Sequence, residues 1–537
     1  MPSAHVDTFT ADHLPPPDQW PQLCFESADL QALSSRTQLN CAADLLDAAV
    51  ARGWGSRACV KSDAVSWTYA ELLAQSNRVA QVLVRDMGLV PGNRVLLRSP
   101  NTPMMAACWL GVVKAGGVAV PTMPLLRERE LRVILEKAQI SHALCDVALA
   151  EALNAAATGS PLRHTRWIGG TGTDALETAM ARHGDHFDNV DTAATDTAFL
   201  AFTSGTTGIP KATMHFHRDV MAACLCWPQH ILRATADDVF IGSPPLAFTF
   251  GLGGLLLFPL HVGASTVLLP QASPPLLLDG ILRHRATVVF TSPTSYRAMA
   301  ARGAELRPSP LRHCVSAGEA LPAATRELWQ QATGRGMIDG IGSTELLHIF
   351  ISATAETSVP GATGQVVPGY QARVVDDLGQ PMPDGQIGRL AVRGPTGCRY
   401  LADERQTQYV QQGWNLTGDA YWLDPQGYFH YVSRTDDMIV SSGYNIGAPE
   451  VEDALMAHPA VAECGVIGAP DEERGQIVKA FVVLRQGHPG NDAMIRSLQD
   501  HVKATIAPYK YPREVRFVDA LPRTETGKLQ RFRLRDL

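Results

Sequence analysis

The sequence lacks an excess of positive charge, and its first residues lack the pattern expected of a secretory leader. Its 537 residues carry 46 Lys and Arg against 53 Asp and Glu, a formal net charge of −7. A whole-protein attraction to nucleic acid or to an anionic membrane is therefore not expected, and any anion must be met by a local site. The N-terminus has no basic flank followed by an apolar block; Pro15-Pro16-Pro17 comes early instead. The cytoplasm is the predicted location.

Closely spaced cysteines are almost absent as well. Only Cys224 and Cys226 are near neighbours among the ten cysteines, and no C-x-x-C occurs. Structural zinc sites need paired ligands at short spacing, and disulfide frameworks belong to small secreted chains. We therefore expect buried reduced thiols, without metal–thiolate or redox chemistry.

Charged residues are missing altogether between residues 239 and 278, a stretch that includes the apolar run 254–258. A membrane span is one explanation for such a stretch. However, prolines interrupt it repeatedly, and no uninterrupted apolar run approaches the roughly 20 residues that cross a bilayer. These prolines are Pro244, Pro245, Pro259, Pro270, Pro274 and Pro275. We predict a buried core segment.

What the sequence does contain is an alternation of helix-like and strand-like segments. Its length allows roughly three to four packing units of about 150 residues each. Residues 104–114 have a helical pattern that stops at Gly116-Gly117, and a strand pattern follows at 118–121. Such alternation predicts an α/β fold in which sheets are buried between helices.

The pattern changes toward the C-terminus. Short strands separated by Gly, Pro and Asp turns predict a small β-rich subdomain, at residues 372–375, 388–392 and 428–432. After Arg434-Thr435-Asp436-Asp437 the α/β pattern returns, with a helix near 449–458 and strands near 462–467 and 480–484. We predict a large N-terminal domain over residues 1–435 and a smaller α+β domain over residues 436–537.

The strongest local signal is Thr203-Ser204-Gly205-Thr206-Thr207-Gly208-Ile209-Pro210-Lys211, after a strand-like segment at 198–202. Glycines let backbone N–H groups approach phosphate oxygens, hydroxyls add donors, and lysine supplies a positive charge. This composition favours a phosphate-binding loop over a mobile surface turn. The loop differs from that of the common nucleoside triphosphatases, because Pro210 precedes Lys211 and residues 212–214 resemble a strand rather than a helix.

Three weaker clusters follow. Asp339-Gly340-Ile341-Gly342-Ser343-Thr344-Glu345 ends in a carboxylate that would suit Mg²⁺ beside a phosphate site. Thr417-Gly418-Asp419 could bind both hydroxyls of a ribose, although a turn-stabilising Asp explains an isolated match better. Pro522-Arg523-Thr524-Glu525-Thr526-Gly527-Lys528 would by itself be a frayed tail.

In this order and spacing, the four clusters together resemble the adenylate-forming superfamily. This superfamily comprises acyl-CoA and aryl-CoA ligases, peptide-synthetase adenylation domains and beetle luciferases. The resemblance extends from about Asn40 to Lys528. It implies a large N-terminal domain and a mobile C-terminal domain, with ATP and CoA as co-substrates and Mg²⁺ as cofactor.

The resemblance also implies a role for each matching residue in ATP binding. The β- and γ-phosphates would be held by Thr203, Ser204, Gly205, Thr206, Thr207, Gly208 and Lys211. Glu345 would ligate Mg²⁺, and Thr344 would lie near the α-phosphate. The adenine side would be formed by Ala317, Gly318, Glu319, Asp339, Gly340, Ile341 and Gly342, and the ribose site by Asp419 and Arg434. Ile341 stands where many relatives carry Tyr, so adenine would pack on an aliphatic side chain.

Further matches concern the C-terminal domain. Lys528 matches the lysine that contacts the acid's carboxylate and the α-phosphate during adenylation. For the thiol step, relatives rotate the C-terminal domain about a hinge, which Asp436 matches. Ser442, Gly443 and Tyr444 would line the CoA tunnel, and Lys510 would lie near the phosphates of CoA.

The acyl pocket is expected at Phe248, Thr249, Phe250, Gly251 and His348. Two phenylalanines, a glycine and a histidine suit a flat ring, although the same residues could simply be core. Residues 342–350 resemble benzoate-type CoA ligases. The segments 12–17, with Trp20, and 214–219 resemble the 2-aminobenzoate–CoA ligase branch.

We therefore expect an ATP-dependent aryl-CoA ligase that activates 2-aminobenzoate as the aryl adenylate, releases pyrophosphate and transfers the aryl group to CoA. A benzoate– or hydroxybenzoate–CoA ligase is the alternative, and Phe250, where benzoate ligases often place Tyr, argues against unsubstituted benzoate. A peptide-synthetase domain is disfavoured because no Gly-x-Asp-Ser carrier motif follows, whereas the shared motifs do not exclude a luciferase-like oxygenase.

A non-catalytic nucleotide-binding scaffold is disfavoured because Glu345, Asp419 and Lys528 are all present. The expected partners are the aryl acid, ATP and CoA, without nucleic acid or membrane. A monomer or a homodimer is expected.

Overall fold

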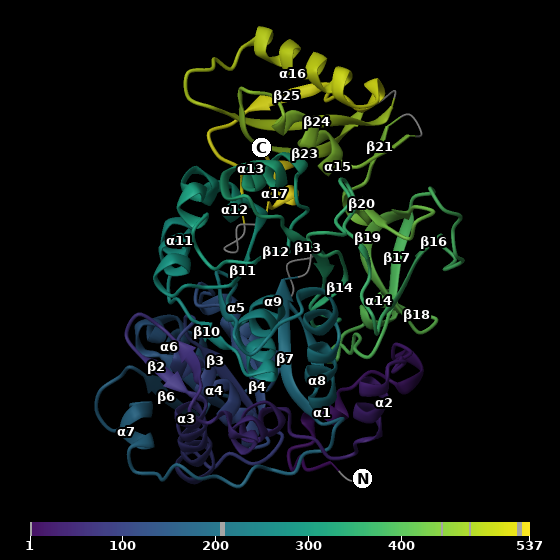
Figure 1. The fold of residues 1–537 in the computed structure, drawn as a ribbon. Coiled ribbons are helices and arrows are strands. Elements are labelled where there is room, and N and C mark those ends of the chain that lie inside the picture. The colour runs from purple at the N-terminus through teal and green to yellow at the C-terminus, as the bar shows by residue number, and fades with distance from the viewer. Residues whose placement is uncertain (1–2, 205–209, 442–443, 472–473, 524–528) are drawn as a thin grey trace.

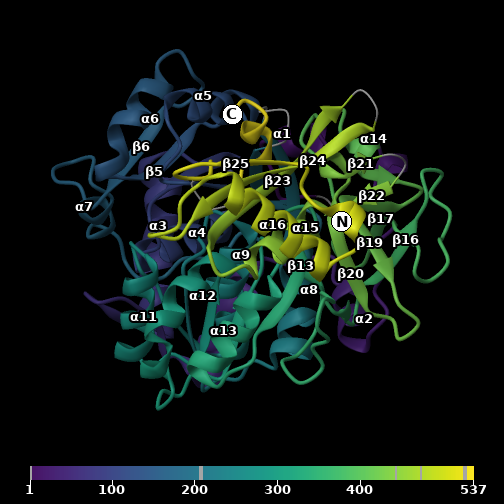
Figure 2. The ribbon, with the colours of Figure 1, turned by 90° about the horizontal axis from the view of Figure 1, so that it is seen from above.

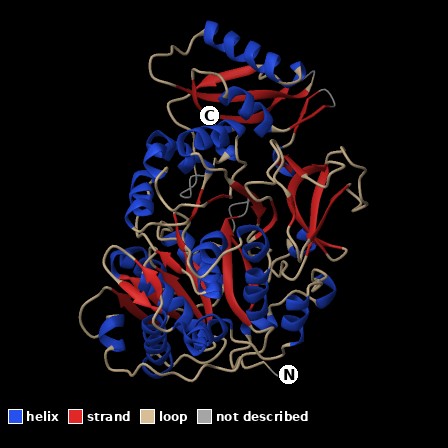
Figure 3. Ribbon diagram, viewed as in Figure 1, coloured by secondary structure: helices blue, strands red, loops and turns tan. Residues whose placement is uncertain are grey.

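The computed structural model describes residues 3–204, 210–441, 444–471, 474–523 and 529–537. Figure 1 shows a large lower part built from the first two thirds of the chain, a green β-rich part at one side and a yellow C-terminal part on top. Helices surround the strands of the lower part (Figure 3). The predicted α/β class, with a large N-terminal domain and a smaller C-terminal one, is confirmed.

A six-stranded sheet carries the phosphate-loop motif. Its order is β6-β5-β3-β4-β7-β8, parallel except for the antiparallel β7–β8 pair at one edge. The predicted strands on both sides of the loop are confirmed. The strands are β3 (Arg94–Arg98), β4 (Val118–Thr122), β5 (His142–Asp146), β6 (His164–Ile168), β7 (Thr197–Ser204) and β8 (Pro210–Phe216).

A nine-stranded sheet carries the glycine-rich clusters, in the order β15-β14-β13-β12-β11-β9-β10-β1-β2. Its central strands are parallel, and β2, β14 and β15 pair antiparallel at the two ends. The strands are β1 (Ala58–Lys61), β2 (Ser66–Thr68), β9 (Val239–Gly242), β10 (Ser265–Val267), β11 (Val288–Thr291), β12 (His313–Ser316), β13 (Ile338–Gly342), β14 (Ile349–Ser352) and β15 (Gln365–Val366).

Local sequence signals explain the ends of helix α4. The Oγ1 of Thr102 accepts a hydrogen bond from the Met105 backbone at 3.1 Å, and Pro103 occupies the first turn. The helix ends before Gly116, whose φ of +70° suits glycine. The helices of the lower part are α1 (Phe9–Asp12), α2 (Ala28–Ser35), α3 (Tyr69–Gln81), α4 (Pro103–Lys114), α5 (Glu128–Lys137), α6 (Ala150–Ala157), α7 (Leu176–Met180), α8 (His217–Leu225), α9 (Thr249–Leu252), α10 (Phe258–Val262), α11 (Pro274–Arg283), α12 (Pro293–Met299) and α13 (Ala323–Thr333).

The predicted β-rich subdomain is an antiparallel sheet in the order β16-β17-β19-β18, with β20 paired to β19. All three predicted strands are present in it. The elements are β16 (Gln371–Val375), β17 (Gly388–Arg393), α14 (Gln406–Tyr409), β18 (Val410–Gln411), β19 (Trp414–Leu423) and β20 (Phe429–Arg434).

The C-terminal part has its own sheet, order β22-β21-β24-β23 with β25 parallel to β24, and its own apolar core. From above, β23, β24 and β25 lie across the middle of the molecule (Figure 2). The elements are β21 (Ile439–Ser441), β22 (Tyr444–Ile446), α15 (Ala448–Met456), β23 (Val461–Asp471), β24 (Gly475–Leu484), α16 (Asp492–Thr505), β25 (Glu514–Phe517) and α17 (Arg531–Leu534). The division at residue 436 stays a prediction.

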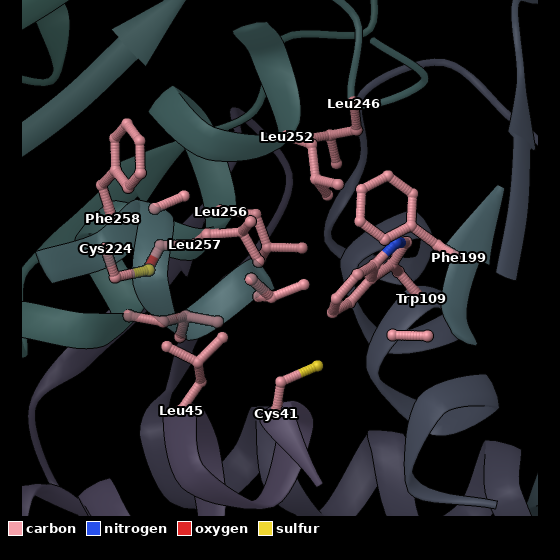
Figure 4. Packing of buried hydrophobic residues seen from close by; sticks show 14 of the residues in the cluster. Cys41, Leu45, Trp109, Phe199, Cys224, Leu246, Leu252, Leu256, Leu257 and Phe258 are labelled. Atoms are coloured by element: carbon pink, nitrogen blue, oxygen red, sulfur yellow. The ribbon is translucent and has the colours of Figure 1, made fainter. Parts of the chain in front are cut away.

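Most of the uncharged stretch is buried, as predicted, although residues 270–276 are exposed or only partly buried. Leu255, Leu256, Leu257 and Phe258 have no exposed surface and belong to the main apolar core. Figure 4 shows part of this core, in which Trp109 and Phe199 lie side by side with ring centroids 6.2 Å apart. Among the residues that the structure describes, no helix is both long enough and apolar enough to cross a membrane.

Candidate active site

The phosphate-loop motif begins and ends on paired strands. Thr203 on β7 lies directly opposite Lys211 on β8. This pairing holds the two ends of the motif at the edge of the sheet, where β8 is the last strand. The Thr203 Oγ1 is buried without a hydrogen-bond partner among the described residues. Gly205, Thr206, Thr207 and Gly208 lie outside the described residues, as does the side chain of Ser204.

Lys211 contacts the predicted magnesium ligand. Its Nζ lies 2.9 Å from Oε1 of Glu345, and the hydroxyl of Tyr400 donates to the same Oε1 at 2.5 Å. Lys211 also lies over the ring of Tyr400, 4.7 Å from its centroid. Burial acts to raise the pKa of Glu345, but the charge of Lys211 and the two hydrogen bonds outweigh it and hold the pKa below its usual value. The site therefore presents an ionised carboxylate beside a cation.

Sequence reasoning missed Tyr400. It follows β17 in the chain, 55 residues after Glu345, and reaches the site only because residues 399–401 run alongside β8. Gly394 and Gly397 precede it and Asp403-Glu404-Arg405 follow it, but this polar segment matched none of the four clusters and was given no role.

The predicted adenine-side residues lie at neighbouring strand ends. Ser316 and Asp339 pair on the parallel strands β12 and β13, so Ala317, Gly318 and Glu319 emerge beside β13. Ligands of open α/β sheets bind at such carboxyl ends. Burial raises the pKa of Asp339 to about 6, although Arg326 lies 4.0 Å away.

Glycines on β13 are required by the close approach of β14. A Cβ on Gly340 would lie 2.7 Å from Cγ2 of Ile349, and one on Gly342 would lie 2.8 Å from the backbone oxygen of His348. Ile341, between the two, packs against the main core with its side chain partly buried. The loop after β13 then carries Thr344, Glu345 and His348.

Asp419 and Arg434 face each other across the β-rich subdomain. They are directly paired on β19 and β20, and Nη1 of Arg434 lies 3.1 Å from Oδ1 of Asp419. Burial raises the pKa of Asp419, an effect that Arg434 opposes. Gly418 has φ +77°, and a Cβ there would lie 2.6 Å from Nη2 of Arg434. Glycine at this position therefore leaves room for the guanidinium.

Of the predicted acyl-pocket residues, Phe250 lies next to His348. Phe250 of helix α9 lies 5.7 Å from the His348 ring, centroid to centroid, and Phe258 contacts that ring edge-on at 4.5 Å. Phe248, Thr249 and Gly251 belong to the same helix or its N-terminal cap. Trp227, Phe258 and Phe290 complete the aromatic surround and were missed by sequence reasoning, since each is an ordinary core residue in its own segment.

His348 is a buried, neutral imidazole. Burial lowers the pKa of the ring to about 3, and an interaction with the Phe250 backbone offsets this only in part. Neither ring nitrogen has a partner of full hydrogen-bond geometry among the described residues. A Cβ on Gly253 would lie 2.5 Å from Cδ2 of His348, so this glycine makes space for the ring. Unpaired polar groups at such depth carry a free-energy cost unless a ligand or water satisfies them.

The C-terminal part brings Tyr444 close to Lys510. Tyr444, 54% exposed, stacks on Tyr509 with ring centroids 4.5 Å apart. The Nζ of Lys510 bonds both carboxylate oxygens of Glu450 at 2.6 Å. Asp436 belongs to the 3-10 turn Thr435–Asp437, and its side chain is outside the described residues. Ser442, Gly443 and Lys528 are also outside them.

One contact joins the C-terminal part to the adenine-side loop. Nη1 of Arg523 lies 3.9 Å from Oε1 of Glu319, while its Nη2 bonds Glu463 at 2.9 Å. Glu319 also accepts a hydrogen bond from Thr294 at 3.2 Å. The segment that leads toward residue 528 therefore begins at this edge of the site.

Comparison with known proteins adds to this geometry. The family described as "AMP-binding enzyme" matches residues 47–400, and its C-terminal domain matches residues 450–528. The chain is 37% identical to the benzoate–CoA ligase of Thauera aromatica, over 94% of this chain and 97% of that protein. It is 34% identical to the 4-hydroxybenzoate–CoA/benzoate–CoA ligase of Rhodopseudomonas palustris, over 93% and 94%.

A solved structure is similar throughout. The crystal structure of the anthranilate CoA ligase AuaEII in complex with anthranoyl-AMP matches with a TM-score of 0.88 and 34% identity, over 94% of this chain and 98% of that chain. The chain therefore belongs to the AMP-binding enzyme family. The predicted aryl-CoA ligase branch and the predicted class, an AMP-forming acid–thiol ligase, are confirmed with it.

Proposed function

We propose that this protein is an ATP-dependent 2-aminobenzoate–CoA ligase. The observation that carries the proposal is the aromatic enclosure around His348, in the same loop as Glu345. A flat ring fits between aromatic side chains, and the neutral imidazole has one donor and one acceptor for a polar substituent. Similarity to benzoate– and anthranilate–CoA ligases supports an aromatic acid.

In the first half-reaction, a carboxylate oxygen of the acid attacks the α-phosphorus of ATP. The bond from the α-phosphorus to the bridging oxygen breaks, and pyrophosphate leaves. Lys211 and the hairpin loop hold the phosphates, and Asp419 with Arg434 binds the ribose. Lys528 places its ammonium where negative charge gathers, because two anions must be brought together.

Glu345 fits the role of a magnesium ligand. Among the described residues, no group of three or more His, Cys, Asp and Glu could hold a metal by itself. A single buried carboxylate suffices for Mg²⁺, which takes its other ligands from phosphates and water. The ion would supply charge neutralisation at the phosphates. Lys211, paired with Glu345 in the free protein, would turn to the phosphates when ATP binds.

In the second half-reaction, the thiol of CoA attacks the carbonyl carbon of the aryl adenylate. The thiol loses its proton to solvent, the new C–S bond forms, and the C–O bond to the phosphate breaks, so that AMP leaves. We propose that the C-terminal domain turns about Asp436, which removes Lys528 from the carbonyl and brings Ser442, Gly443 and Tyr444 to the thiol path. Lys510 would then meet the phosphates of CoA.

The remaining proposals follow from the same function. The enzyme would work in the cytoplasm on ATP, CoA and the aryl acid, with Mg²⁺, as a monomer or homodimer. Benzoate or a hydroxybenzoate is the alternative acid, because curated relatives with those names are 32–37% identical.

A substrate panel tests the proposal. Pyrophosphate release is measured with ATP, CoA and each of benzoate, 2-aminobenzoate, hydroxybenzoates, phenylacetate and medium-chain fatty acids. We expect the highest kcat/KM with 2-aminobenzoate. A preference for fatty acids would contradict the aromatic pocket. If ATP binds but none of the acids supports pyrophosphate release, the protein is a non-catalytic scaffold. Light emission would indicate a luciferase-like oxygenase.

A further inference from the structure

A buried ion pair lies behind the candidate site, and no step above uses it. Asp219 and Arg399 have no exposed side-chain surface, and Nη1 of Arg399 donates to Oδ2 of Asp219 at 2.8 Å. Arg399 also lies over the ring of Phe216, 4.0 Å from its centroid, and under Trp20 at 5.3 Å. Burying two charges costs desolvation free energy, and apolar residues of similar volume would often stabilise the core equally well. A role beyond stability would explain the pair.

His215 connects this pair to the site. Its Nδ1 lies 3.9 Å from Oδ2 of Asp219, and its Nε2 lies 2.8 Å from the backbone oxygen of Thr344. A carbonyl oxygen can only accept, so Nε2 carries the hydrogen and donates it. The ring is completely buried and stacks on Phe199 with centroids 4.8 Å apart. The Nδ1 atom has no hydrogen-bond partner among the described residues. The imidazole is therefore held by its bond to the Thr344 oxygen and by its stacking on Phe199.

The loop that His215 contacts is strained. Leu347 has φ +73° and is completely buried, although a left-handed backbone is unfavourable for leucine. The Leu347 N–H donates to the same Thr344 oxygen at 3.2 Å, and Oγ1 of Thr396 donates to the oxygen of Leu346 at 2.8 Å. Such a turn persists only when its surroundings hold it.

The strained turn has a clear consequence for the site, because it carries Glu345 before Leu347 and His348 after it. A shift of the Thr344 carbonyl would move the carboxylate proposed for the phosphates and the ring proposed for the aryl acid at once. One hydrogen bond from His215 acts on the peptide that joins Thr344 to Glu345.

The segment after β17 holds this region from two sides. Its backbone runs alongside β8, since Met214 N–H donates to the Arg399 oxygen at 2.8 Å and Leu401 N–H to the Ala212 oxygen at 2.9 Å. Successive side chains of an extended segment point to opposite faces. Arg399 therefore reaches Asp219 on one side, while Tyr400 reaches Glu345 on the other.

We propose that His215 is a positioning residue for adenylation and that it fixes the Thr344–Glu345 peptide. The Asp219–Arg399 pair contributes by holding residues 399–401 alongside β8, the strand that carries His215. The proposal rests on the function proposed above. It assigns to His215 no contact with ATP, the acid or CoA.

The test replaces His215 by glutamine or by asparagine, whose side-chain amides differ in length. In His215→Gln the side-chain NH₂ can occupy the place of Nε2 and donate to Thr344. In His215→Asn the shorter side chain places its NH₂ near the position of Nδ1 and cannot reach. Adenylation is measured as acid-dependent exchange of pyrophosphate into ATP, and thiol transfer as CoA-dependent consumption of supplied aryl adenylate. Both assays use the aromatic acid that the wild type prefers.

We expect His215→Asn to lower kcat of adenylation by about 10- to 100-fold, the effect of a small misplacement of reacting groups, while thiol transfer stays near the wild-type rate. His215→Gln should restore most of the lost rate. Hydrogen exchange of residues 343–348 should be faster in the Asn variant only. If the Asn variant does not fold, His215→Leu, which also lacks the donor, takes its place.

The matched control is His217→Gln. His217 is a second fully buried histidine two positions along the chain, and its Nδ1 accepts from the Cys41 backbone at 3.2 Å, away from the site. This variant should change the rates of adenylation and thiol transfer by the same factor, or leave both unchanged. Wild-type adenylation by the Asn variant, or equal losses in the Asn and Gln variants, would overturn the positioning role. If the wild type shows no pyrophosphate exchange with any aromatic acid, the proposed function is refuted instead. Hydrogen exchange of residues 343–348 would still test whether His215 fixes the Thr344–Glu345 peptide.

Discussion

At the scale of single residues, the site combines ionised and neutral groups whose state follows from burial and from partners. Lys211 and Tyr400 keep the pKa of Glu345 low despite its burial, so that the carboxylate is charged and able to bind a cation. His348 has no charged neighbour to offset its burial, so its pKa falls to about 3 and the ring stays neutral at physiological pH. One end of the loop is therefore suited to phosphate chemistry and the other to a neutral aromatic ring.

The first prediction concerns His348. His348→Ala should lower kcat/KM for 2-aminobenzoate by about tenfold relative to benzoate, because a hydrogen bond to the substituent is worth roughly 1–2 kcal/mol. Initial rates of pyrophosphate release with both acids measure this ratio. Benzoate is the internal control, since it has the ring without the amino group. Equal losses for the two acids would show that the histidine only fills space.

The second prediction is a pH dependence of stability. The folded pKa of Asp339, about 6, lies above its ordinary value of 3.8, so the folded protein binds more protons than the unfolded chain between these two values. Its contribution to stability is present below pH 4 and is lost as pH rises to about 6, by about 1.4 kcal/mol for each unit of pKa difference. Asp339→Asn should remove this loss, so the variant gains stability relative to wild type as pH rises.

Urea unfolding between pH 4.5 and 7 measures that difference. Asp377→Asn is the control, because the Asp377 side chain is 99% exposed. A stability difference between the wild type and Asp339→Asn that does not change with pH would contradict the raised pKa.

At the scale of elements, pairs of strands bring the motifs together. The register of β7 with β8 places Thr203 opposite Lys211, and the register of β19 with β20 places Asp419 opposite Arg434. In each pair the sequence supplies turn residues and polar side chains, while the pairing sets the distance between them. A change in the backbone at such a position should therefore affect binding as well as stability.

Gly418 allows the third prediction. Gly418→Ala places a Cβ against the Arg434 guanidinium in a left-handed conformation, so it should destabilise the fold by more than about 1 kcal/mol and raise KM for ATP severalfold. Denaturant unfolding and pyrophosphate-release kinetics measure the two effects.

Gly427→Ala is the matched control, in the turn between the same two strands. Its φ is +82°, but the nearest atom to a new Cβ is Nε2 of Gln365 at 3.7 Å. This variant should lose a similar conformational free energy and keep the wild-type KM for ATP. If both variants raise KM equally, the contact with Arg434 is not the cause.

At the scale of the whole molecule, the C-terminal part lies over the carboxyl-end side of the nine-stranded sheet, where Arg523 lies near Glu319 (Figure 1). It carries Tyr444 and Lys510 as well as the segment that leads to Lys528. The residues proposed for the two half-reactions therefore belong to one small body with its own core. This arrangement supports the proposed turn about Asp436, because separate faces can then serve the site in sequence.

The fourth prediction separates the two half-reactions. Lys528→Ala should lower adenylation by at least about 100-fold, because a charge-stabilising group is lost, and should leave ATP binding and thiol transfer from supplied aryl adenylate largely intact. Tyr444→Ala should do the reverse, raising KM for CoA by about three- to tenfold, the effect of one aromatic contact. Arg496→Ala, an exposed cation on α16, is the control. Parallel losses in both half-reactions would contradict the two-face arrangement.

Local patterns in the sequence predicted many of the strands and helices and part of the candidate site. Glycines, hydroxyls and a lysine close together favoured a phosphate-binding loop at 203–211, because phosphate binding uses those residue types. The cluster at 339–345 and Asp419 were weak matches by themselves. Apolar periodicity and turn residues marked β7, β8 and α4, and the uncharged stretch as core. The family resemblance then supplied roles that no spacing by itself defines.

Only the tertiary structure decided which distant residues complete the site. Tyr400 reaches Glu345, Phe258 and Phe290 enclose His348, and His215 meets the Thr344 carbonyl, across separations in the chain that carry no local signal. The physical reason is that a side chain's partners, burial and pKa depend on strand order and register. These are set by the packing of the whole core rather than by any one segment.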